Sequence, residues 1–172
     1  MIIVVGLGNP GKAYEHTRHN AGFLALDVFA KEHGYPVLKL SAKHQALLSE
    51  GTGAILAKPQ TFMNKSGTSA KSLLKQGGEL IVVHDDIDIP IGAVKVSKDR
   101  GSAGHKGVES IIEALGSKDF TRIRIGILPS AGKPEDVEDF VLKNFTVKEL
   151  SLIQEAYKQA SRILSGLIAE TK

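Results

Sequence analysis

His19 lies in a short polar segment and carries a side chain that can take a proton from water at neutral pH. In that role an imidazole needs a carboxylate that holds its other nitrogen and fixes the tautomer. Asp85, Asp86 and Asp88 offer such carboxylates, and Asp85 is the nearest to the end of an apolar strand expected over residues 80–83. By position alone His19 is better explained as a surface or helix-capping histidine, but together with Asp85 it predicts a general base that activates water.

Asn9 and Asn64 are candidates for polarising a carbonyl group. Acyl transfer needs hydrogen-bond donors aimed at the oxygen that becomes negatively charged, and side-chain amides supply such donors. Both asparagines follow predicted strands, over residues 2–5 and 54–57. Local turn formation explains either asparagine equally well when it is taken alone, because asparagine readily hydrogen-bonds its own backbone.

Other hydrolytic schemes fit the sequence less well. The chain has no cysteine and no G-x-S-x-G motif, so a thiolate is excluded and neither Ser66 nor Ser102 has the setting of a serine nucleophile. The run from His84 to Asp88 offers metal ligands, but there is no H-E-x-x-H motif, and such a run after a strand is common in solvated loops. We therefore expect water as the nucleophile and no metal.

Gly6, Gly8 and Gly11 form a G-x-G-x-x-G pattern directly after the first predicted strand. In a dinucleotide-binding fingerprint a helix opens within the glycine run, and an acidic residue follows about 20 positions later at the end of a second strand. Here the helix is delayed, and the acids at about that distance, Asp27 and Glu32, fall within it. We interpret the glycines as a sharp turn rather than a nucleotide site.

Apolar periodicity predicts alternating strands and helices. Strands are expected over residues 2–5, 54–57, 80–83, 93–96 and 123–127, and helices over residues 23–33, 67–76, 107–115 and 147–169, with Asn20 capping the first helix. This order predicts one α/β domain over residues 1–172, with a central mixed, mostly parallel sheet flanked by helices. Ligands bind beyond the carboxyl ends of strands in such sheets, so Asn9, Asn64 and Asp85 are expected to meet there.

Composition points to a soluble protein with a basic segment. The net charge is +3 and the pI about 9.0, and residues 95–124 hold seven Lys and Arg against four Asp and Glu. A local basic excess is typical of a surface that contacts nucleic acid, although an excess this small is weak evidence by itself. The lack of cysteine, of a long apolar run and of a basic leader predicts a cytoplasmic protein without a membrane segment.

Several motifs, in order along the chain, resemble those of a known family. They are Gly6-Leu7-Gly8-Asn9-Pro10-Gly11, Tyr14, Thr17-Arg18-His19-Asn20-Ala21-Gly22, Lys58-Pro59, Thr61-Phe62-Met63-Asn64, Ser66-Gly67, His84-Asp85-Asp86, Gly104-His105 and Arg122-Ile123-Arg124-Ile125-Gly126-Ile127. The chain is similar to bacterial-type peptidyl-tRNA hydrolases over residues 2–142. A series of blocks this long is far more specific than any one short motif.

The resemblance implies a monomeric α/β hydrolase that needs no cofactor. Such an enzyme cleaves the ester between a peptide and the 3′-terminal ribose of tRNA, and so recycles tRNA from stalled translation. By matching position, His19 is implied to be the general base for water and Asp85 the carboxylate that orients it. Asn9 and Asn64 are implied to bind the peptide end of the substrate and to place the water or polarise the carbonyl.

The same resemblance implies further contacts with the substrate. Residues implied to line the cleft or bind the substrate are Tyr14, Phe62, Met63 and His105. Lys95 and Arg124 match basic residues that hold the 5′ phosphate of tRNA. The family usually has asparagine where this chain has Lys106, which can only donate hydrogen bonds. We therefore expect Lys106 to contact a phosphate near the 3′ end of tRNA; the alternative is a side chain that only points into solvent.

Two other functions compete with this one. A non-catalytic RNA-binding relative of the same fold binds tRNA without hydrolysis, but loss of chemistry releases the catalytic positions to change, and all four are intact here: His19, Asp85, Asn9 and Asn64. An enzyme that uses a nucleotide at the loop of residues 6–11 is expected to bind NAD or ATP. The intact set of four favours the hydrolase.

Overall fold

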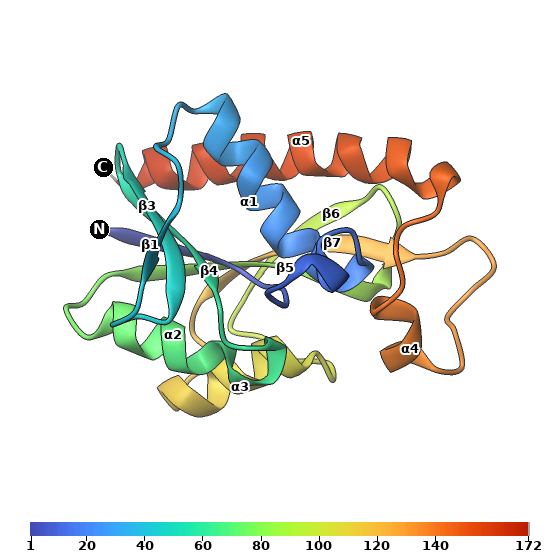
Figure 1. Ribbon diagram of the computed structural model, residues 1–172, viewed down its shortest axis with the longest axis horizontal. Helices are drawn as coiled ribbons and strands as arrows, with labels where there is room; N and C mark the ends of the chain where they lie inside the picture. The colour runs from blue at the N-terminus through green and yellow to red at the C-terminus, as the bar shows by residue number, and fades with distance from the viewer. Residues whose placement is uncertain (172) are drawn as a thin grey trace.

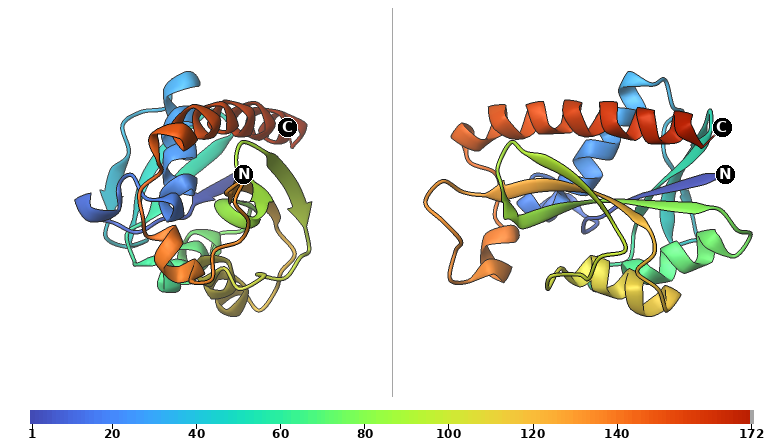
Figure 2. Two further views of the ribbon diagram at one scale, coloured as in Figure 1. Left: turned by 90° about the vertical axis from the view of Figure 1, so that its right-hand side faces the viewer. Right: turned by 180° about the vertical axis from the view of Figure 1, so that it is seen from behind.

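A mixed β-sheet lies between two layers of helices in the computed structural model, which describes residues 1–171 (Figure 1). Helices α1 (Ala21–Glu32) and α5 (Val147–Glu170) cover one face of the sheet, and α2 (Ser66–Leu74) and α3 (Lys106–Leu115) cover the other. Figure 2 shows the same two layers from behind and from one end. The arrangement confirms the predicted α/β class with helices flanking a sheet.

The other elements form the sheet and the loops around it. The strands are β1 (Ile2–Gly6), β2 (Lys39–Ser41), β3 (Ala46–Gly51), β4 (Ala54–Pro59), β5 (Glu79–Pro90), β6 (Val94–Lys98) and β7 (Thr121–Leu128). The short helices are η1 (Lys12–Tyr14), η2 (Arg18–Asn20), η3 (Met63–Lys65) and α4 (Val137–Val141). The sequence does not predict β2, β3 or α4, because none of them shows a clear apolar pattern. Among residues 1–171, no helix combines the length and the apolar character that crossing a membrane requires.

The part of the chain that the structure describes forms a seven-stranded sheet in the order β2-β3-β4-β1-β5-β7-β6. The pairs of β4 with β1, β1 with β5 and β5 with β7 are parallel, and the pairs toward either edge are antiparallel. Val4 and Val83 pack under α1 and α5, whereas Val5 and Val82 pack under α2 and α3, because alternate residues of a strand point to opposite faces. The predicted mixed sheet is confirmed, with its parallel strands at the centre.

Strand β5 continues well past the predicted strand. Its neighbour β1 stops with Gly6 paired to Val83. The pairing with β7 goes on, and it places Asp85, which was expected to follow the strand, inside β5 opposite Ile125. Polar residues stay in the strand because β7 supplies partners for their backbone groups. Beyond Val83, one edge of β5 is therefore left to the loop that follows β1.

The side chain of Asn20 fixes this loop. Its Oδ1 accepts a hydrogen bond from the backbone N–H of Asn9 at 2.8 Å, and its Nδ2 donates to the backbone carbonyl of Asn9 at 3.0 Å. Asn20 occupies the N-cap position of α1 as predicted, but its side chain makes no capping hydrogen bond, because both ends of its amide are used in this contact. Helix α1 starts directly against β5 because Gly22 has no Cβ, which would collide with the carbonyl oxygen of Val83.

Arg18 ties the turn before α1 to the C-terminal part of the chain. Its guanidinium donates two hydrogen bonds to the carboxylate of Glu149, from Nη2 to Oε1 at 2.6 Å and from Nε to Oε2 at 3.4 Å. It also donates to the carbonyl oxygens of Phe140 and Lys143, and lies 3.9 Å from the centroid of the Phe140 ring. Glu149 also accepts from the N–H of Thr146 in the capping box that begins α5. Distant parts of the chain thus fix the position of η2.

The replacement Glu149→Gln is expected to lower the free energy of unfolding by about 2 to 4 kcal/mol, because it leaves the buried guanidinium of Arg18 without a counter-charge. Urea unfolding measures the change. The control Glu155→Gln removes a charge from an exposed pair on the same helix, and should change the free energy by less than about 0.5 kcal/mol. Equally small effects from both substitutions would contradict the role of Arg18 as an anchor.

Candidate active site

The carboxylate of Asp85 lies between two imidazole rings. Its Oδ2 is 2.8 Å from Nδ1 of His19, and its Oδ1 is 2.8 Å from Nε2 of His105. Asp85 is 2% exposed, and both imidazoles are nearly buried. The structure thus brings His19 and Asp85 together as the sequence predicts, and it adds His105 as a second partner of the same carboxylate.

The tautomer of His105 follows from its position at the start of α3. Its Nδ1 accepts hydrogen bonds from the backbone N–H groups of Gly107 and Val108, at 3.1 and 3.3 Å, and so caps the helix. Because Nδ1 is an acceptor, the proton of this ring is on Nε2, which donates to Asp85. His105 is therefore held by α3 as a fixed donor to the carboxylate.

His19 has the electrostatic setting of a base. Burial by itself would lower the pKa of His19, but the charge of Asp85 and the hydrogen bond to it outweigh burial and raise the pKa above its ordinary value. Burial would raise the pKa of Asp85, but the charges and hydrogen bonds of His19 and His105 lower it far below its usual range. Asp85 is thus ionised and accepts from Nδ1 of His19, which leaves the lone pair of His19 on Nε2.

His84 is buried beside the pair of His19 and Asp85 and is not part of it. Its Nδ1–H donates to the backbone carbonyl of Asp85 at 2.6 Å, and burial followed by the nearby ring of His105 holds the pKa of His84 well below its ordinary value. Within residues 1–171, His19, Asp85 and His105 offer possible metal-ligand atoms within 4.8 Å of one another. A metal on Nε2 of His105 would displace the proton that the cap of α3 requires there.

Asp86 and Asp88, the other carboxylates of this strand, have partners of their own. Asp86 accepts from Nε of Arg124 at 2.9 Å in a nearly buried ion pair. Asp88 forms an exposed ion pair with Lys133 at 3.0 Å. Of the two residues expected at a tRNA phosphate, Arg124 is therefore occupied by Asp86, whereas Lys95, opposite it in the register of β6 and β7, is exposed.

Asn9 and Asn64 both face a cavity of about 200 Å³, which we call the amide cavity; its lining also includes His19, Phe62 and Met63. Asn9 is nearly buried, and its Oδ1 accepts from the backbone N–H of Met63 at 2.8 Å. This bond uses Oδ1 and leaves Nδ2 as the donor end of the Asn9 amide. Asn64 is exposed at the rim. Amide donors and the imidazole of His19 therefore open into the same space.

A second cavity of about 280 Å³ is called the β5 cavity; its lining includes Asp85, Ile87 and His105. His19 lines both cavities. The ring of Tyr14 packs edge to face with that of Phe62, which lines the amide cavity, with the centroids 6.3 Å apart. His19 thus stands where two binding spaces meet.

Comparison with known proteins decides the family. A family model described as peptidyl-tRNA hydrolase matches residues 3–172. The chain belongs to this family. The peptidyl-tRNA hydrolase of Thermodesulfovibrio yellowstonii is 41% identical, over 99% of this chain and 94% of the relative, and that of Aquifex aeolicus is 42% identical, over 96% and 89%. A crystal structure of peptidyl-tRNA hydrolase from Acinetobacter baumannii matches with a TM-score of 0.91 at 32% identity, covering 99% of this chain and 90% of that one.

This member of the peptidyl-tRNA hydrolase family has contacts around the site that its sequence did not indicate. Lys106, expected at a phosphate, has its Nζ 2.5 Å from Oε1 of Glu138. Arg18 and Asn20 position the turn that carries His19. Their place next to His19 in one motif could have indicated this role. Glu138 had no such signal, because nothing in the sequence pairs α4 with the start of α3.

The replacement Asp85→Asn is expected to lower the pKa of His19 from above about 6.5 to below it, because burial still disfavours the imidazolium after the counter-charge is gone. Titration of the ring signals of His19 by NMR measures the pKa, with the exposed His16 as the reference in both proteins. A pKa that stays the same or rises would mean that Asp85 does not control the protonation of His19.

Proposed function

We propose that this chain hydrolyses the ester bond between the peptide and the 3′-terminal ribose of peptidyl-tRNA, with His19 as the general base and water as the nucleophile. Membership of the peptidyl-tRNA hydrolase family supports the reaction. The hydrogen bond of His19 to the buried Asp85, where two cavities meet, is the observation that carries the assignment of the base. The protein acts as a cytoplasmic monomer that recycles tRNA from stalled translation.

The attack of water follows from the protonation of the two residues. Nε2 of His19 takes a proton from water while the water oxygen forms a bond to the carbonyl carbon of the ester. The ionised Asp85 stabilises the imidazolium and keeps its own charge. The tetrahedral intermediate then breaks its bond to the ribose oxygen, and His19 returns the proton to that oxygen. The products are a peptide with a free carboxyl group and tRNA with a 3′-terminal hydroxyl.

The carbonyl oxygen gains negative charge during this attack and needs hydrogen-bond donors. Nδ2 of Asn9 is suited to this role, because its Oδ1 is held by the backbone of Met63 and the amide cannot turn freely. Asn64 offers another amide at the rim of the amide cavity. We assign the peptide end of the substrate to this cavity, with the exposed ring of Phe62 as an apolar contact.

The proposed reaction uses no metal ion or other cofactor. Water is activated by His19, and charge on the carbonyl oxygen is stabilised by amide donors, so the reaction has a base and an electrophilic group without a metal. The proton on Nε2 of His105 makes that nitrogen a donor to Asp85 rather than a ligand. Hydrolysis is therefore expected to continue in the presence of EDTA.

The replacement His19→Ala is expected to lower kcat by about 10² to 10⁴-fold, the usual contribution of a general base, and to leave tRNA affinity nearly unchanged. The measurement is cleavage of an N-acetylated aminoacyl-tRNA with EDTA present. His16→Ala is the matched control, because His16 is exposed and lines neither cavity. Turnover close to that of the unchanged protein in His19→Ala would remove His19 from the mechanism.

The same assay separates the hydrolase from a non-catalytic RNA-binding relative. A binding protein of that kind leaves the ester intact while it retains tRNA tightly, and it gives the same result with and without His19. Cleavage that survives EDTA and is lost with His19 supports both the reaction and the base. An intact ester in the unchanged protein would contradict the proposed function.

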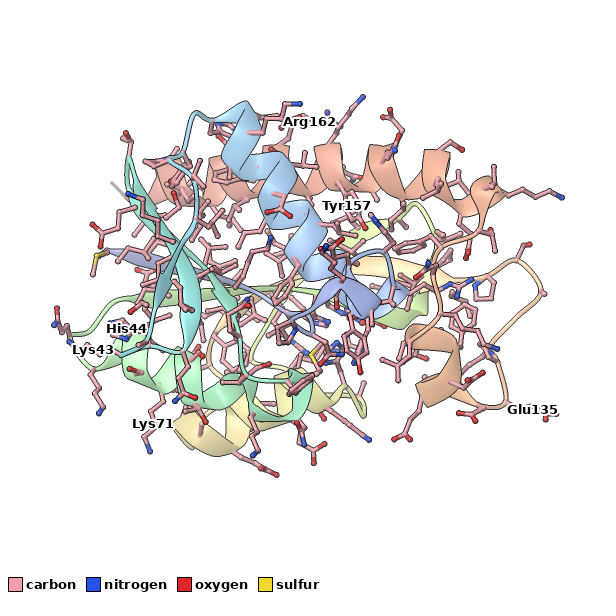
Figure 3. The ribbon with its side chains drawn as sticks, in the orientation of Figure 1. Lys43, His44, Lys71, Glu135, Tyr157 and Arg162 are labelled. Atoms are coloured by element: carbon pink, nitrogen blue, oxygen red, sulfur yellow. The ribbon has the colours of Figure 1, made fainter. Side chains whose placement is uncertain are left out.

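Lys95 is our candidate for contact with the 5′ phosphate of tRNA, because it is exposed while the charge of Arg124 is offset by Asp86. Lys95→Ala is expected to weaken tRNA binding and to reduce the slope of log K against log salt by about 1. Binding measured at several salt concentrations tests this. The control Lys71→Ala removes an exposed charge at the end of the molecule away from α4 (Figure 3). An unchanged slope in Lys95→Ala would contradict the assignment.

A further inference from the structure

Lys106 and Glu138 form an ion pair at the boundary between the two cavities. Nζ of Lys106, the first residue of α3, is 2.5 Å from Oε1 of Glu138 in α4. Both residues line the amide cavity and the β5 cavity, as do His19 and Val141. The pair therefore joins two walls of the cleft beside the proposed base.

The segment that carries Glu138 is attached to the rest of the protein in two different ways. Toward α5 it is held by Arg18, which donates to two backbone carbonyls and lies over the ring of Phe140. Toward α3 and β5 it is held by exposed ion pairs, one between Glu138 and Lys106 and another between Lys133 and a carboxylate of β5. The segment thus has a buried anchor on one side, with Val141 in the core, and exposed ion pairs on the other.

We propose that Lys106 and Glu138 form a latch that closes the cleft over the proposed base and opens to admit the substrate. The inference rests on the proposed function, because the reacting carbonyl must lie at His19. The peptide extends from that carbonyl in one direction and the ribose in the other, so a bound substrate occupies space on both sides of His19. In the closed state the ion pair stands between those two spaces.

The ion pair of Lys106 and Glu138 is weak enough to break and form again, as a latch requires. The side chains of Lys106 and Glu138 are 58% and 74% exposed, and exposed pairs favour the paired state by only roughly two- to five-fold. The closed state is therefore the major one without substrate, and it opens at little cost. Because only the open fraction binds substrate, the latch raises KM by about the same factor.

Lys106 belongs to the cleft as well as to the latch, because it lines both cavities together with His19. Lys106 also carries a positive charge that lowers the pKa of His19, against the larger effect of Asp85. Opening of the latch takes the carboxylate of Glu138 away from Lys106 and leaves this charge unpaired beside His19, so the position of α4 and the basicity of His19 are coupled.

Two single substitutions and their combination test the latch. Lys106→Met and Glu138→Gln are each expected to lower KM about two- to five-fold, and the double variant is expected to equal either single one, since one partner suffices to break the pair. The ratio of KM to that of the unchanged protein should approach one as salt is added. Lys158→Met and Glu155→Gln are matched controls for the charge changes, from an exposed pair on α5.

The comparison of the single and double variants also distinguishes the latch from a contact of Lys106 with phosphate. If Lys106 binds phosphate, Lys106→Met raises KM and Glu138→Gln does not lower it, and this result would overturn the latch. Additive effects of the two substitutions would overturn it as well, because residues that act only through their mutual contact are not additive.

A reversible cross-link tests closure directly. The chain has no cysteine, so Lys106→Cys with Glu138→Cys introduces a single pair of thiols that a short disulfide-forming bifunctional reagent can join. The locked protein is expected to lose at least about ten-fold in kcat/KM and to recover it when dithiothreitol removes the link. Each single cysteine variant treated in parallel controls for the modification itself.

Binding of a short N-acylaminoacyl adenosine ester to the locked and reduced proteins, in a His19→Ala background, gives a readout that needs no turnover. Weaker binding by the locked form supports the latch, and equal binding with equal turnover overturns it. Failure of the proposed function is a different result: the unchanged protein leaves the tRNA ester intact, whatever the two forms of the cross-linked variant bind.

Discussion

The buried carboxylate of Asp85 organises the cleft, because a charge removed from water must be surrounded by hydrogen-bond donors. Two imidazoles supply these donors, and different parts of the chain hold them. His19 is carried by the turn before α1, and His105 by the start of α3, where its other nitrogen caps the helix. Gly107 allows the first turn of α3 to lie this close to the cleft, since a Cβ at this position would collide with Sδ of Met63. One charge thus fixes the sheet, the N-terminal loop and α3 relative to one another.

Much of the fold follows from local pattern, and the exceptions follow from distant contacts. Strand β1 and helix α5 are predictable because burial in the centre of a sheet, or along one face of a helix, imposes a strong apolar pattern. The second half of β5 is not predictable, because its polar residues remain in the sheet only through pairing with β7. The edge strand β2 has only exposed and half-buried positions, and its neighbour β3 mixes buried, half-buried and exposed ones, so their sequences resemble loops.

The residue types of the proposed site were predictable, but its connections were not. Asn9, Asn64 and Asp85 could be grouped because neighbouring strand ends meet at one edge of a sheet, and His19 could be paired with Asp85 because an imidazole base needs a carboxylate. The bond of Asn20 to the loop before it depends on a backbone path that has no sequence pattern, and an isolated asparagine before a helix is normally a cap. The partners of long charged side chains are even harder to predict from the sequence. The partner of Lys106 is decided by where the fold places Glu138, far along the chain.

Arg18 and Glu149 join the turn of His19 to the first turn of α5, near the other end of the chain. The backbone bridge between Thr17 and Asn144 adds another link of the same kind. A ribosome makes the chain from its N-terminus, so this turn emerges long before its anchors have been synthesised. The cleft is therefore completed only after residue 149 has been synthesised, and the turn that carries the proposed base cannot reach its final position before then.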